Sequence, residues 1–115
     1  MKFEVPVPEI SVETLKQRID ASQAPIIIDV REPHELTFAQ LPPAAGVIHI
    51  PMGQLPVRLK DLESKKDEEI AVLCRSGMRS EMVTNFLLQN GFKKVFNIAG
   101  GILAWCAVDA SVKPY

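Results

Sequence analysis

IAVLCRSGMRS, residues 70–80, carries an apolar run into a short turn that holds one cysteine and two arginines. The four residues from Ile70 to Leu73 are typical of a strand that is buried on both faces. Beyond the turn, helical spacing of apolar residues predicts a helix that Gly91 can terminate, with one face formed by Met82, Val83, Phe86 and Leu87. Cys74 is therefore expected where a buried strand ends and a helix begins.

The turn around Cys74 is expected to favour a negatively charged sulfur. A chain that passes from a strand into a helix leaves backbone amides unpaired, and the helix dipole adds to their attraction for an anion. Gly77 allows a positive φ, so that successive N–H groups can converge on the sulfur, while Arg75 and Arg79 add positive charge. Ser80 is a candidate cap for the helix that follows. These surroundings are typical of a reactive thiolate.

Strands and helices alternate along the rest of the chain. The expected strands, besides 70–73, are the apolar runs 26–30, 47–50 and 95–98. Two further helices are expected. The first has Ser11 as its N-cap and carries Val12, Leu15 and Ile19 on one face. The second carries Leu55, Leu59 and Leu62 on one face. Such alternation predicts an α/β fold with a parallel sheet covered by helices on both faces, whose ligands bind at the carboxyl ends of the strands.

Length and composition indicate one domain over residues 1–115, with residues 109–115 as a C-terminal tail. Thirteen basic and fourteen acidic side chains give a net charge of −1, so we expect neither a nucleic acid nor a membrane as partner. The first twenty residues do not resemble a signal peptide and no apolar run is long enough to span a bilayer. We therefore expect a cytoplasmic protein. The sequence makes no prediction of its oligomeric state.

The chain has two cysteines, Cys74 and Cys106, which lack the spacing of a disulfide framework or a zinc site. His34 and His49 are isolated from them, so neither a metal nor another cofactor is expected. Cys74 could be an inert buried residue, but an inert position has no use for two nearby guanidinium groups. Cys106 is expected to pack as a small apolar residue, and a role as a second redox thiol or sulfur acceptor stays open.

Four motifs in order resemble the single-domain rhodaneses, a family of sulfurtransferases. They are IDVREPHE at 28–35, IHIP at 48–51, CRSGMRS at 74–80 and AGGILAW at 99–105. The resemblance implies a rhodanese-like fold, with a central, mostly parallel five-stranded sheet flanked by helices on both faces. One departure is the insertion Pro43-Ala44-Ala45, which lengthens the loop before the second motif. This loop also lacks the histidine that is usual in the family. We expect this insertion to change the surface and not the chemistry.

The resemblance also implies a chemistry and a set of site residues. Cys74 would carry a persulfide, and the loop to Arg79 would bind the donor as in the thiosulfate-using type, through Arg75, Ser76, Gly77, Met78 and Arg79. Asp29, Arg31 and Ser80 would support this loop, although the residues alone allow Asp29 and Arg31 to be only a structural ion pair. Sulfur would pass from thiosulfate, or from a persulfide donor, through Cys74 to cyanide or to a thiol or protein acceptor.

Two other functions remain open from the sequence. A cysteine-dependent phosphatase also places a thiolate in an anion-binding loop, but it has arginine six positions after the cysteine, where this chain has Ser80. A non-catalytic, rhodanese-like interaction module is the second alternative, and a complete loop with its cysteine argues against it. Separate assays of thiosulfate turnover and of phosphatase activity would distinguish a sulfurtransferase from a phosphatase.

Overall fold

The computed structural model describes residues 6–115, so the first five residues of the predicted domain lie outside it. Five strands form one sheet in the order β1-β5-β4-β2-β3, and each neighbouring pair is parallel. The strands are β1 (Glu9–Ile10), β2 (Ile26–Asp29), β3 (Ile48–His49), β4 (Glu69–Leu73) and β5 (Lys94–Ile98). The predicted five-stranded α/β fold is confirmed.

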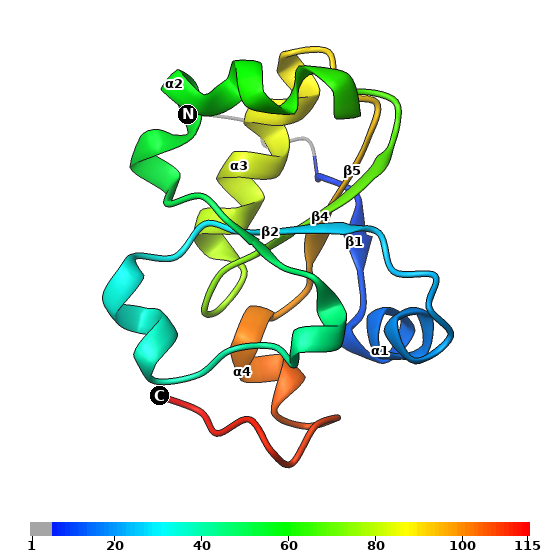
Figure 1. Ribbon diagram of the computed structural model, residues 1–115, viewed down its shortest axis with the longest axis vertical. Helices are drawn as coiled ribbons and strands as arrows, with labels where there is room; N and C mark the ends of the chain where they lie inside the picture. The colour runs from blue at the N-terminus through cyan, green and yellow to red at the C-terminus, as the bar shows by residue number, and fades with distance from the viewer. Residues whose placement is uncertain (1–5) are drawn as a thin grey trace.

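Helices cover both faces of this sheet (Figure 1). They are α1 (Val12–Asp20), α2 (Leu55–Arg58), α3 (Met78–Gln89) and α4 (Gly101–Trp105). Successive strand residues point to opposite faces, so Ile27 and Leu73 pack with α1 and α4, while Ile28 and Val72 pack with α2 and α3. The continuous apolar runs of the inner strands are explained by this double coverage.

Two elements differ from the sequence-based expectation. Strand β1 was not predicted, because its two residues are too few to form a pattern. The expected helix with Leu55, Leu59 and Leu62 is α-helical only from Leu55 to Arg58 and then becomes a 3₁₀ helix over Leu59–Lys65. The three-residue step from Leu59 to Leu62 fits the 3₁₀ repeat, and Leu55 and Leu62 remain in the core.

Both ends of α3 are built by glycine. Gly91 has φ +90°, and the bonds from Phe92 N to Leu87 O (3.1 Å) and from Gly91 N to Leu88 O (3.3 Å) complete a Schellman motif, as predicted. The prediction that Ser80 caps α3 is wrong. Gly77, at φ +100°, lets the helix begin at Met78, so Ser80 lies in its first turn and is fully buried.

The start of α4 lies directly against the loop that follows β4. Gly100 and Gly101 have φ of +75° and +58°, and this conformation brings α4 amides onto loop carbonyls. Ile102 N donates to Cys74 O at 3.0 Å, and Leu103 N donates to Arg75 O at 3.1 Å. A Cβ atom on Gly101 would contact Cys74 O and would lie 2.6 Å from Arg75 O. Glycine is therefore required for this approach.

Replacing Gly101 with alanine should destabilise the protein by about 3 kcal/mol, because the new methyl group meets backbone atoms and the backbone is strained at positive φ. Gly53→Ala is the matched control, since nothing lies within 4 Å of its Cβ position, and we expect a change within about 0.5 kcal/mol. Urea denaturation measures both values. Equal stabilities for the two variants would contradict the close approach of α4 to the loop.

Candidate active site

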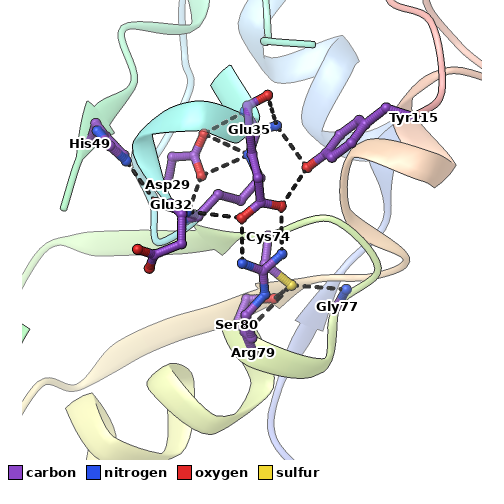
Figure 2. A network of polar contacts seen from close by, with 10 residues as sticks. Asp29, Glu32, Glu35, His49, Cys74, Gly77, Arg79, Ser80 and Tyr115 are labelled. Carbon is purple, nitrogen blue, oxygen red and sulfur yellow. Dashed lines mark hydrogen bonds and ion pairs between the residues drawn. The ribbon is translucent and has the colours of Figure 1, made fainter. Parts of the chain in front are cut away.

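The sulfur of Cys74 lies in a cradle of hydrogen-bond donors (Figure 2). The N–H groups of Gly77 and Ser80 point at Sγ, with nitrogen to sulfur distances of 3.1 and 3.4 Å, and the Ser80 hydroxyl lies 3.2 Å from Sγ. Two amides converge on the sulfur, but they are three residues apart and not successive as predicted. Cys74 is only 1% exposed, whereas Arg75, Ser76 and Met78 in the same loop are exposed.

The carbonyls of the cysteine loop accept hydrogen bonds from residues outside the loop. Cys74 O and Arg75 O accept the α4 amides described above, and Gly77 O accepts from Asn97 Nδ2 at 3.1 Å and from Glu81 N at 3.1 Å. These bonds fix the backbone of the loop, and the N–H groups that reach the sulfur belong to the neighbouring peptide units, Ser76–Gly77 and Arg79–Ser80. The loop conformation is therefore imposed by α4 and β5 as well as by the loop itself.

Ser80 and Asn97 form a buried polar floor beneath the sulfur. The Ser80 hydroxyl lies 2.5 Å from Asn97 Oδ1, and its single proton serves either this oxygen or the sulfur. Ser80 is fully buried and Asn97 is 3% exposed. Sequence reasoning missed Asn97, although an asparagine between the apolar residues of a buried strand is a recognisable signal, since buried polar groups need a partner.

The arginines of the loop have different surroundings. Arg79 forms a two-pronged ion pair with Glu35, with nitrogen to oxygen distances of 2.6 and 2.9 Å. The Arg79 guanidinium lowers the pKa of Glu35 to about 2, against the opposing effect of burial. Arg75 is exposed, and its guanidinium lies 4.9 Å from the centre of the Tyr115 ring. The positive charge predicted at Arg79 is thus offset by a carboxylate that sequence reasoning missed.

Asp29 and Arg31 form a buried ion pair at the end of β2. Arg31 Nη2 lies 2.8 Å from Asp29 Oδ2, and Arg31 is fully buried. Arg31 Nη1 also donates to the Tyr115 hydroxyl at 3.0 Å, and that hydroxyl donates to Glu35 Oε1 at 2.9 Å. The pair is therefore both architectural and connected to the loop, through Tyr115, Glu35 and then Arg79 (Figure 2).

Tyr115 brings the C-terminal tail to this network. Residues 109–115 contain no helix or strand, yet Val112 is buried and the Tyr115 ring stacks on Phe38 with centroids 5.5 Å apart. Figure 1 shows the C-terminal end beside the segment that follows β2. Sequence reasoning missed this contact. The available signal was one aromatic residue at the end of a segment in which polar and apolar residues alternate.

The remaining candidate residues lie in ordinary structural contacts. His49 Nε2 lies 2.7 Å from Arg31 O, and the Cys106 thiol donates to Ile102 O at 3.2 Å. Pro43–Ala45, the inserted residues, form a short 3₁₀ helix with Ala45 buried. Within residues 6–115 no three histidine, cysteine or acidic side chains are grouped as metal ligands. None of the helices in this range has the length and apolar character needed to cross a bilayer.

Two known proteins are similar to this chain in sequence. "Putative sulfurtransferase YtwF" of Bacillus subtilis (strain 168) is 42% identical over 108 residues, which cover 94% of this chain and 96% of that protein. "Putative sulfur carrier protein YrkF" of the same organism is 41% identical over 99 residues, which are 86% of this chain and 51% of that protein, so the chain spans about half of that relative.

The crystal structure of a rhodanese-related protein from Thermoplasma volcanium has the same fold. It superposes with a TM-score of 0.76 at 34% identity, covering 92% of this chain and 97% of that one. The family model of the rhodanese-like domain matches residues 11–108. These residues include β4 and β5, at whose carboxyl ends the site lies, together with the cysteine loop and α4. The chain is a member of the rhodanese-like domain family.

Proposed function

We propose that this protein is a sulfurtransferase in which Cys74 accepts a sulfane sulfur from thiosulfate or a persulfide donor and passes it to cyanide or to a thiol or protein acceptor. The observation that carries this proposal is the sulfur cradle, in which two amides and a hydroxyl face one buried Sγ. An inert core cysteine would have apolar neighbours at these positions. The names of the two Bacillus relatives, a sulfurtransferase and a sulfur carrier, support the same chemistry.

The first step is nucleophilic attack by the Cys74 thiolate on the outer sulfur of thiosulfate. A bond forms between Sγ and that sulfur, the sulfur–sulfur bond of thiosulfate breaks, and sulfite leaves with the electron pair. The charge of −3 is the same before and after, because a thiolate and a dianion give a persulfide anion and a sulfite dianion. Neither a general base nor a metal is required, since nucleophile and leaving group are both stable anions.

In the second step the acceptor attacks the outer sulfur of the Cys74 persulfide. Cyanide gives thiocyanate, a thiolate gives a new persulfide, and Cys74 returns as a thiolate in both cases. The Gly77 and Ser80 amides point at Sγ and so stabilise its negative charge in the thiolate state. A single well-aimed donor of this kind contributes on the order of a hundredfold in rate in other anion-binding sites.

The alternative functions fit the structure less well. A phosphatase loop would use its arginine to clamp a phosphate, whereas Arg79 is the fifth residue after Cys74 and is already bound by Glu35. A pure interaction module would need no donor groups aimed at a sulfur. The expected partners are a small sulfur donor and a thiol or protein acceptor, and the cytoplasmic location stays a prediction.

Cys74→Ser should abolish persulfide formation, because no sulfur nucleophile remains in the cradle. Intact mass spectrometry after incubation with thiosulfate should show a gain of one sulfur atom in the wild type, removed by a reductant, and no gain in the variant. Cys106→Ser is the control and should gain sulfur as the wild type does, since Cys106 bonds only Ile102 O within its helix. A reductant-sensitive gain in Cys74→Ser would reject the mechanism.

The Glu35–Arg79 ion pair should make stability depend on pH in the acid range. The pKa of Glu35 is about 2 in the folded protein against 4.5 for the ordinary group, so its contribution is complete above pH 4.5 and is lost as pH falls towards 2. Glu35→Gln should lower the free energy of unfolding at neutral pH by on the order of 3 kcal/mol.

Urea denaturation between pH 7 and pH 2 measures this effect, and the difference between Glu35→Gln and the wild type should shrink across that range. Glu63→Gln is the matched control, because Glu63 pairs with Lys66 at the surface and is 64% exposed. We expect it to change stability by less than about 1 kcal/mol at any pH. A Glu35→Gln difference that stays constant with pH would contradict the assignment.

A further inference from the structure

Glu35 is a carboxylate held in place by four hydrogen bonds. Two come from Arg79, the Tyr115 hydroxyl donates to Oε1 at 2.9 Å, and the Glu32 N–H donates to Oε2 at 2.9 Å. The side chain is 10% exposed, so water competes little for these bonds. Arg79 and Glu35 therefore form a fixed pair without net charge at the edge of the cysteine loop.

Arg75 is the contrasting cation. It is exposed, and within residues 6–115 no carboxylate lies at ion-pair distance from it. Its guanidinium lies over the face of Tyr115 at 4.9 Å, a distance suited to a cation–π contact. The Tyr115 ring is itself fixed by stacking on Phe38 and by the bonds of its hydroxyl to Arg31 and Glu35. One residue thus positions both Glu35 and Arg75.

This arrangement limits the charge that the loop offers to a donor. Two unpaired guanidinium groups would match the double negative charge of thiosulfate, but Glu35 cancels one of them. The donor must also approach a sulfur that is negatively charged in the proposed function. Like charges brought together in a partly buried site repel each other strongly unless counter-charges offset them.

We propose that Glu35 and Tyr115 are positioning residues that set donor specificity, so that the loop favours a hydropersulfide with at most one negative charge over the dianion thiosulfate. This inference rests on the proposed sulfur transfer through Cys74. With a hydropersulfide R–S–SH, the Cys74 thiolate attacks the terminal sulfur, a bond from Sγ to that sulfur forms, and the donor S–S bond breaks. R–S⁻ leaves with the electron pair and takes its proton from water, while Cys74 holds the hydropersulfide.

The test compares two donors on the full chain, thiosulfate and 2-hydroxyethyl hydropersulfide, which has no other charged group. Glu35→Gln keeps the shape of the side chain and removes its charge, so Arg79 becomes an available counter-charge. We expect the KM for thiosulfate to fall about tenfold and the KM for the hydropersulfide to change less than twofold. Glu32→Gln is the matched control, because it removes the same charge from an exposed neighbour that forms no ion pair with Arg79, and it should change neither KM.

Tyr115→Phe gives a second test that does not depend on the stability of Glu35→Gln. The phenylalanine ring keeps its place over Arg75, but the hydroxyl donor to Glu35 is lost, so Glu35 holds Arg79 less firmly. We expect the KM for thiosulfate to fall about threefold, again without a matching change for the hydropersulfide.

The possible results separate the inference from the function beneath it. An unchanged or higher KM for thiosulfate in Glu35→Gln and Tyr115→Phe would overturn the proposed specificity, as would equal changes for both donors, which indicate a general structural effect. A wild type that forms no Cys74 persulfide with either donor would instead reject sulfur transfer itself. A fall confined to thiosulfate, absent in Glu32→Gln, supports the inference.

Discussion

The site depends on the hydrogen bonds by which the first amides of α4 hold the carbonyls of Cys74 and Arg75. With Gly77 O also fixed, by Asn97 and Glu81, the backbone of the loop is held in the conformation in which the N–H groups of Gly77 and Ser80 point at one sulfur. The glycine pair before α4 is needed because any side chain at Gly101 would occupy the space of the loop carbonyls. The parallel sheet supplies the rest, since it brings the ends of β4 and β5 to the same edge.

A second layer of contacts fixes the charges around this cradle. The buried Asp29–Arg31 pair anchors the Tyr115 hydroxyl, which in turn bonds Glu35, and Glu35 holds Arg79. Each of the four charged groups in this network, Asp29, Arg31, Glu35 and Arg79, has a partner of opposite charge, as buried charges require. The result is a loop with inward amides, one neutralised arginine and one arginine laid over an aromatic ring. In the proposed specificity, charge at the rim, rather than the shape of the loop alone, distinguishes one sulfur donor from another.

Local patterns in the sequence predicted much of the fold and the centre of the site. Continuous apolar runs revealed the inner strands, and a cysteine followed by Gly77 at the end of one of them indicated the cradle. What the sequence could not predict depends on distant contacts. Glu35 and Arg79 are 44 positions apart, and Tyr115 reaches Glu35 across 80 positions. The local pattern predicts Ser80 as a helix cap, but the positive φ of Gly77 starts the helix earlier and turns Ser80 towards the sulfur.

The central claim is that the amides of Gly77 and Ser80 hold the sulfur that does the chemistry. The most direct test records the amide spectrum of ¹⁵N-labelled protein before and after one sulfur atom is added by a donor. The account predicts that the Gly77 and Ser80 resonances shift most, while that of Ala107, beside the second cysteine, stays in place. Unmoved Gly77 and Ser80 resonances in protein that has gained sulfur, or shifts centred on Ala107, would contradict it.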